Sequence, residues 1–116
     1  MKIGCVREIK PQEFRVGLTP GAAQEAVAHG HAVLIEAGAG LGSGYADADY
    51  LAAGAQIAPD AATVWGTAEL VIKVKEPQAG ERAMLRPGQV LFTYLHLAPD
   101  PAQTHDLLKS GATCIA

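Results

Sequence analysis

The stretch VAHGHAVLIE, residues 27–36, joins the end of a helical pattern to an apolar strand through one glycine. The same order recurs in LAAGAQIA (51–58) and LKSGATCIA (108–116). A glycine just after a helix adopts the left-handed conformation there without the steric cost that a Cβ imposes. The glycines expected in this role are Gly30, Gly54 and Gly111. Three helix–glycine–strand units predict a chain that alternates helices with strands.

Apolar runs extend this alternation along the whole chain. The predicted strands are residues 2–6, 32–36, 56–58, 69–75, 89–95 and 113–116. Helix starts are predicted at Thr19-Pro20 and at Asp47, Asp60 and Asp100. Short loops between alternating elements predict an α/β fold with an open, mostly parallel sheet and helices on both faces, flavodoxin-like or Rossmann-like. The strand order is left open.

The bulk composition excludes several classes of protein. The 116 residues are 49% hydrophobic and 18% charged, with a net charge of −3 and no run of Lys or Arg that could bind nucleic acid. No apolar segment is long enough to cross a bilayer, and the charged N-terminus does not resemble a signal peptide. The two distant cysteines, Cys5 and Cys114, favour reduced thiols in a cytoplasmic protein. Because the chain ends inside an apolar run, we expect a segment of a longer protein.

The glycine-rich stretch GAGLGSG, residues 38–44, follows a predicted strand and therefore has to be compared with a phosphate-binding loop. In the pattern G-x-G-x-x-G the third glycine position falls on Ser43 or Tyr45, and the next helix is expected to start only at Asp47. No Walker lysine follows. We expect a flexible connection between strand and helix, and contact with a cofactor held by another domain remains open.

Candidate functional residues follow the predicted strands, because ligands of open α/β sheets bind outside the carboxyl ends of the strands. Arg15 lies between Phe14 and Val16 in the segment that follows the first strand. A guanidinium binds a carboxylate in a bidentate manner. For this segment as a whole, a surface loop with solvated ion pairs is the preferred interpretation.

Two lysines alternate with apolar residues in VIKVKEP, residues 71–77. Period-2 alternation places Lys73 and Lys75 on the same face as Val71. Lys75 ends the predicted strand, where its ammonium could bind a carboxylate or take part in proton transfer, and a solvated ammonium is an equal alternative. For Lys73 we expect an ammonium that reaches solvent.

His96 ends the apolar run of the fifth predicted strand. It shares a face with Phe92 and Tyr94. At the end of this strand its imidazole would lie beside a ligand in the crevice, where it could act as a general acid/base. A lone histidine is more often structural, but His96 joins Lys75 and Arg15 at one edge of the sheet. No His, Cys and carboxylate residues have the spacing of metal ligands.

Four segments together resemble the N-terminal part of bacterial alanine dehydrogenases. They are residues 1–20, GHAVLIEAGAGLGSGY (30–45), VIKVKEP and LFTYLHLA (91–98), and the likeness extends from Met1 to Ala116. Nicotinamide nucleotide transhydrogenases share the first of these segments, which contains Arg15, and the K-V-x-x-P region, but depart from TYLHLA. The histidine at position 96 therefore favours the dehydrogenase branch.

The resemblance implies that residues 1–116 are a portion of a substrate-binding domain, inactive alone, within a homo-oligomer that is commonly a hexamer. Such enzymes oxidise L-alanine to pyruvate and ammonia with NAD, which a second domain outside this chain would bind. By resemblance, Arg15 and Lys75 bind the substrate carboxylate, His96 is the acid/base and Tyr94 lies near the pocket. The alternatives are a fragment of a transhydrogenase subunit and a free-standing module that binds a small carboxylate.

Overall fold

A computed structural model describes residues 1–116 and contains a single six-stranded sheet. The strands are β1 (Lys2–Cys5), β2 (Ala32–Glu36), β3 (Gln56–Ala58), β4 (Leu70–Ile72), β5 (Val90–Phe92) and β6 (Thr113–Ile115). The helices are α1 (Pro20–Ala28), α2 (Asp47–Ala52), α3 (Ala61–Thr67), α4 (Ala79–Arg82) and α5 (Pro101–Ser110), with a 3-10 turn η1 (Leu41–Ser43). The predicted alternation is confirmed.

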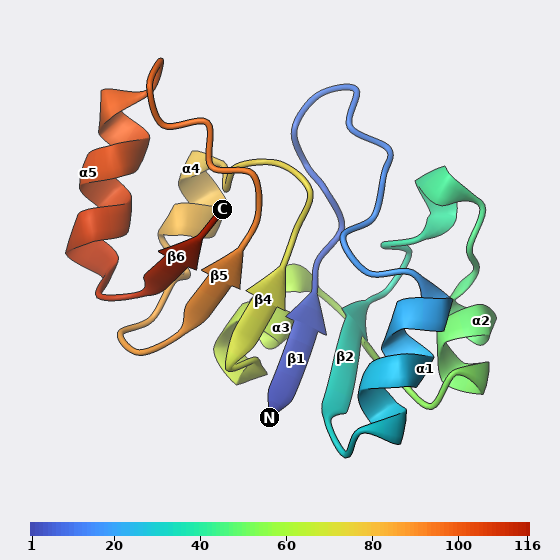
Figure 1. Ribbon diagram of the computed structural model, residues 1–116. Coiled ribbons are helices and arrows are strands. Elements are labelled where there is room, and N and C mark those ends of the chain that lie inside the picture. Colours follow the sequence, from blue (N-terminus) through green and yellow to red (C-terminus); the bar gives the residue numbers. More distant parts are fainter.

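All neighbouring strands are parallel, in the order β3-β2-β1-β4-β5-β6 (Figure 1). This order is Rossmann-like, which settles the alternative that the sequence left open. It reverses between β1 and β4, so a crevice opens outside the carboxyl ends of these two strands. The segments that follow β1 and β4 therefore meet at this crevice.

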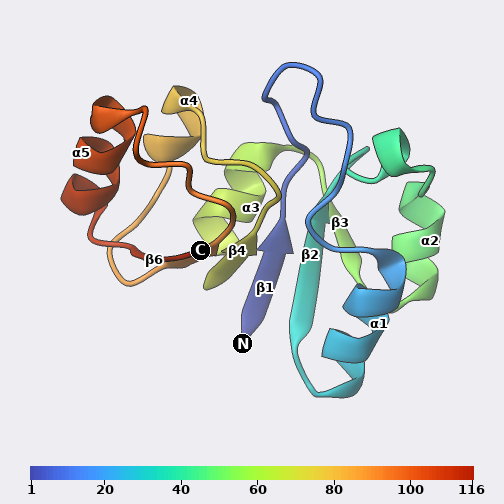
Figure 2. The ribbon, with the colours of Figure 1, turned by 45° about the horizontal axis from the view of Figure 1, so that its top comes forward.

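Two apolar cores cover the two faces of the sheet. On one face α1 and α2 pack on β1 and β2 through residues such as Ala23, Tyr50 and Ile35. On the other face α3 and α5 contribute to a core with Trp65 and Leu91, which Leu85 joins from the segment after α4. Figure 2 shows α1 in front of the sheet and α3 behind it. On the face of the sheet that α1 and α2 cover, no helix packs on β5 and β6, because α1 and α2 lie over β1 and β2.

The glycines at the three helix ends behave as predicted. Gly30, Gly54 and Gly111 have φ angles of 88°, 93° and 74°. Cys5 is fully buried, Cys114 is half-buried, and both are free thiols, as expected. No helix is long and apolar enough to cross a membrane.

The predicted helix starts are confirmed at Thr19, Asp60 and Asp100, whose side chains accept backbone N–H groups of the first turn. Helix α2 also begins at Asp47, but the expectation that Asp47 is its N-cap is wrong. The cap is Ala46, and the carboxylate of Asp47 instead accepts the N–H of Gly38 at 2.9 Å. The side chain thus ties the glycine-rich loop to α2.

The fourth and fifth strands end earlier than predicted, at Ile72 and Phe92. Beyond Ile72 the chain still runs beside β5, since the N–H of Tyr94 donates to the carbonyl of Val74 at 3.3 Å. The regular ladder stops because the Glu8 carboxylate accepts the backbone N–H groups of this segment.

Candidate functional site

The arginine segment, residues 7–18, leaves the carboxyl end of β1 and lies over the crevice as a long loop (Figure 1). Its first residue is fixed to β2, because the N–H of Arg7 donates to Glu36 at 2.8 Å. Its last residue is fixed to α2, because the buried hydroxyl of Tyr50 donates to the carbonyl of Leu18 at 2.7 Å. The segment is therefore anchored at both ends.

Glu8 of this segment forms a buried ionic cluster with Lys73 and Glu81. The Lys73 ammonium lies 2.9 Å from Oε1 of Glu8 and 3.2 Å from Oε2 of Glu81, and each side chain is at most 3% exposed. Burial raises the pKa of Glu81, against the opposing effect of the Lys73 charge. The predicted solvent-reaching Lys73 is thus wrong: two carboxylates compensate the ammonium inside the protein, as a buried charge requires.

The cluster also fixes the backbone of Lys75. The carboxylate of Glu8 accepts the N–H groups of Val74 and Lys75, each at 3.1 Å. On the other side, the carbonyl of Lys75 accepts the hydroxyl of Thr93 at 2.8 Å. Lys75 is therefore held between the segment after β1 and the segment after β5, while its own ammonium makes no ion pair within the protein.

Lys75, Tyr94 and His96 line one open hollow of about 560 Å³ at the carboxyl ends of β4 and β5. Lys75 is half-buried, whereas Tyr94 is 72% exposed and His96 is also exposed. The backbone of His96 adopts a φ of 55°, which is uncommon for a residue other than glycine. Such a conformation persists only where the surroundings impose it, and it directs the chain away from β5 at this point.

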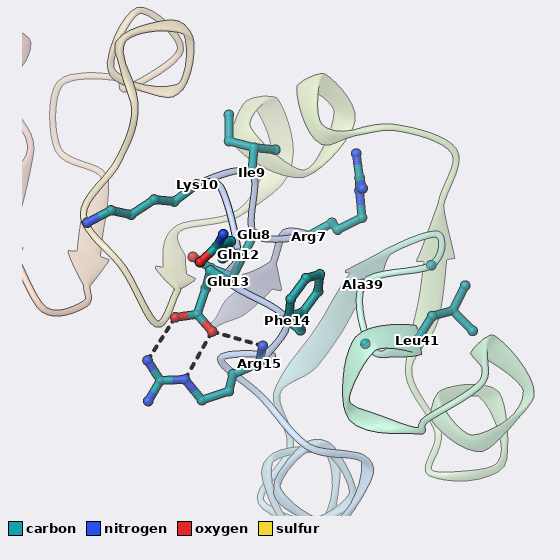
Figure 3. Close-up of a pocket in the computed structure, with 12 residues that line it drawn as sticks. Arg7, Glu8, Ile9, Lys10, Gln12, Glu13, Phe14, Arg15, Ala39 and Leu41 are labelled. Carbon is teal, nitrogen blue, oxygen red and sulfur yellow. Dashed lines mark hydrogen bonds and ion pairs between the residues drawn. The ribbon is translucent and has the colours of Figure 1, made fainter.

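Arg15 lines a neighbouring hollow of about 410 Å³, between the arginine segment and the glycine-rich loop (Figure 3). Its side chain is 63% exposed, and its guanidinium is paired with Glu13 at 2.8 Å. The hydrogen bonds of Arg15 lower the pKa of Glu13 to about 2, and the charge of Lys75 acts in the same direction. The charges of Arg15 and Lys75 thus act on the same carboxylate, although the two residues line different hollows.

The predicted surface loop is correct for part of the arginine segment only. Lys10 forms an ion pair with Glu76 that is open to solvent on the lysine side. Although burial raises the pKa of Glu76, the hydrogen bond from Lys10 lowers it below its ordinary value. Glu8, by contrast, is buried, so the prediction of solvated ion pairs is wrong there.

The glycine-rich loop, which we expected to be a flexible connection, is folded on itself by internal hydrogen bonds. It contains η1, and its N–H groups at Gly38, Ala39, Leu41, Ser43 and Gly44 donate within the protein. A Cβ on Gly42 would lie 2.5 Å from the carbonyl oxygen of Phe14, so glycine is needed where the loop meets the arginine segment. With these donors occupied, the loop does not fit the pyrophosphate of a dinucleotide.

No group of three or more His, Cys, Asp or Glu side chains is arranged to hold a metal ion. The remaining histidines lie away from the crevice. His29 is exposed beside Glu25 on α1, His31 is near the N-terminal amine, and His105 is exposed on α5.

The protein-family comparison matches residues 4–116 to the model described as alanine dehydrogenase/PNT, N-terminal domain. The chain belongs to this family. Alanine dehydrogenases from Halomonas elongata, Mycobacterium tuberculosis and Bacillus subtilis are 57%, 53% and 51% identical over the whole chain, which covers 31%, 31% and 30% of their lengths. The chain thus spans about a third of the curated relatives it matches.

Solved structures of this family share the fold. An L-alanine dehydrogenase superposes with a TM-score of 0.97 at 50% identity over the whole chain and 32% of its own. A transhydrogenase from Sinorhizobium meliloti superposes with a TM-score of 0.93 at 29% identity, again over the whole chain and 34% of its own. The alanine dehydrogenases of this family imply a nicotinamide cofactor and a small-molecule substrate for the family. Both the sequence identity and the TM-score are higher for the L-alanine dehydrogenase than for the transhydrogenase.

The sequence did not reveal the buried cluster of Glu8, Lys73 and Glu81, which fixes the backbone of Lys75. Glu8 and Glu81 are separated from Lys73 by 65 and 8 residues, so no local spacing links them. The available signal was Lys73 itself, since an ammonium on the apolar side of a central strand requires a buried partner. Glu8, directly beyond the neighbouring strand, was the acidic residue closest to that position.

Proposed function

We propose that the chain is the substrate-binding portion of an NAD-dependent alanine dehydrogenase, which converts L-alanine, NAD and water to pyruvate, ammonia and NADH. The observation that carries the proposal is the meeting of Lys75, Tyr94 and His96 in one hollow, with Arg15 in the adjoining one. This set offers two cations for a carboxylate and one imidazole for proton transfer. The dehydrogenase relatives, at 51–57% identity, support this assignment over a transhydrogenase.

In this mechanism the side chains of the chain bind and orient the substrate. Arg15 and Lys75 hold its carboxylate, and the ammonium of Lys75 also stabilises the oxygen that develops on the neighbouring carbon. The contacts of Glu8 and Thr93 fix the backbone of Lys75, from which this ammonium extends. Tyr94 provides one wall of the hollow.

His96 handles the protons of the hydrolytic half of the reaction. Its imidazole accepts a proton when water adds to the imino carbon of the oxidised substrate, and returns it when the carbinolamine breaks down to pyruvate and ammonia. A nicotinamide cofactor supplies the redox chemistry when bound. We assign its binding to a second domain outside residues 1–116, because five backbone N–H groups of the glycine-rich loop already donate within the protein.

The test uses the whole enzyme with His96→Ala. We expect kcat to fall by about 10²–10⁴-fold, the range that a positioned acid/base contributes. The matched control is His105→Ala, an exposed histidine on α5 outside both hollows. Wild-type kcat in His96→Ala would refute the assigned role.

Two further assays separate the alternatives. Exchange between NADH and an NAD analogue, without alanine oxidation, would identify a transhydrogenase. Calorimetry of residues 1–116 with pyruvate or alanine in the absence of NAD tests the free-standing carboxylate-binding module, which predicts heat of binding. The cytoplasmic location, supported by the two free thiols, and the hexamer stay predictions, testable by cell fractionation and light scattering.

A further inference from the structure

Glu13 is the carboxylate paired with Arg15, and all of its side-chain hydrogen bonds are with that residue. Its side chain is 7% exposed, whereas that of Arg15 is 63% exposed. Oε2 of Glu13 accepts the backbone N–H and Nε of Arg15 at 2.9 and 3.0 Å, and Oε1 accepts Nη2 at 2.8 Å (Figure 3). A bidentate pair of this kind fixes the plane of the guanidinium.

The pairing leaves the outer edge of the guanidinium free. Arg15 has five N–H donors on its side chain. Nε and Nη2 face Glu13, and Nη1 makes no hydrogen bond within the protein. A substrate carboxylate can therefore bind the Nη1 and Nη2 edge without displacing Glu13, which supports Arg15 from the protein side.

Glu13 also sets the charge of the site. Its carboxylate lies within the electrostatic influence of both Arg15 and Lys75, which keep it ionised throughout the neutral range. Among the other charges nearby, Lys10 pairs with Glu76 and Lys73 pairs with both Glu8 and Glu81. Arg7 lines the same hollow, but its guanidinium points away from Glu13 (Figure 3). Arg15, Lys75 and Glu13 together carry a single positive charge, which matches one carboxylate. A second carboxylate on the ligand would meet an uncompensated like charge, which disfavours binding.

We propose that Glu13 is a positioning and specificity-determining residue, which orients Arg15 and selects a 2-oxo acid with one carboxylate over one with two. The proposal rests on the proposed function, since it concerns the same carboxylate site. Glu13 touches no reacting atom in this arrangement. Its effect is therefore expected in KM and in the choice of substrate, and much less in kcat.

The test compares pyruvate with oxomalonate, in which a carboxylate replaces the methyl group of pyruvate. Reductive amination of both compounds is measured with the whole wild-type enzyme and with its Glu13→Gln variant. If oxomalonate is not turned over, it is assayed as a competitive inhibitor of pyruvate amination. We expect the KM for pyruvate to rise about 3–10-fold, with kcat within about twofold, and the preference for pyruvate over oxomalonate to fall about tenfold. The control is Glu25→Gln, an exposed carboxylate on α1 that lies outside the site.

Glu13→Asp separates charge from geometry, because it keeps the anion but shortens its reach to Arg15. We expect it to raise the KM for pyruvate and to keep the discrimination against oxomalonate. An active enzyme in which Glu13→Gln changes neither quantity would overturn the inference alone. A lower KM for pyruvate in Glu13→Gln would also overturn it, because Glu13 would then compete with the substrate for Arg15. A wild-type enzyme that does not aminate pyruvate would overturn the proposed function together with this inference.

Discussion

Replacing Lys73 by Met removes the only cation of the buried cluster while keeping most of the side-chain volume. The ammonium lies 2.9 Å from Glu8 and 3.2 Å from Glu81, and all three side chains are almost fully buried. In the variant, Glu8 keeps the N–H groups of Val74 and Lys75, and Glu81 keeps the N–H of Gln78 at 2.9 Å. Hydrogen bonds remain, but two buried carboxylates lose their counter-charge.

We expect Lys73→Met to lower the free energy of unfolding by about 3–5 kcal/mol at pH 7.5, the cost of removing one partner of a buried ion pair. The pKa of Glu81, already raised by burial, should rise further. A carboxyl group whose folded-state pKa lies above its unfolded value contributes stability at low pH and loses it as pH rises through the folded pKa. The deficit of the variant should therefore shrink on acidification toward pH 5.

Urea unfolding measures this effect, followed by the fluorescence of Trp65, which is the only tryptophan and is 1% exposed. The control Lys109→Met changes an exposed lysine on α5 and should shift the free energy by less than about 0.5 kcal/mol. The triple variant Glu8→Gln/Lys73→Met/Glu81→Gln should recover part of the loss, since the unpaired charges are gone. A loss below about 1 kcal/mol in Lys73→Met, or a loss that grows on acidification, would refute the reasoning.

Two further predictions concern the cores. Gly30→Ala and Gly54→Ala both place a Cβ at positive φ, which costs about 1–2 kcal/mol, but at Gly54 the new Cβ would also lie 3.0 Å from Cγ1 of Val27. Urea unfolding should therefore find Gly54→Ala the more destabilised, and equal losses would contradict the close contact. Burial raises the pKa of Cys5 to about 12, so iodoacetamide at pH 8 should alkylate Cys114 first in the native protein. Mass spectrometry of the digested protein measures this order, and equal rates would contradict the burial of Cys5.

The sequence predicted the elements of the fold well, because their signals are local. The glycines after α1 and α2 and the N-caps of α3 and α5 lie where the backbone itself requires them. The alternation of buried and exposed residues from Leu91 to His96 also follows the predicted period of two, although the regular strand ends at Phe92. Period and capping depend on neighbours a few residues away, which a linear sequence displays.

The predicted site residues are placed by the structure in two adjoining hollows, and their roles stay predictions. The sequence suggested the shared edge of Arg15, Lys75 and His96 from the rule that parallel strands present their carboxyl ends together. It could not show that Arg15 is supported by Glu13, since nothing in the spacing of two residues fixes a side-chain conformation. It also failed for Lys73, whose partners depend on which strands are neighbours.

By itself, therefore, the sequence determined the parallel α/β class, the helix ends and the candidate residues at the carboxyl edge, since each depends on local periodicity and turn chemistry. Only the tertiary structure decided the strand order, and with it the position of β4 beside β1. That neighbourhood brings Glu8 to Lys73 across 65 residues and buries their charges together. A buried charge requires a partner of opposite sign, and the sheet order determines which distant residue of the chain can provide it.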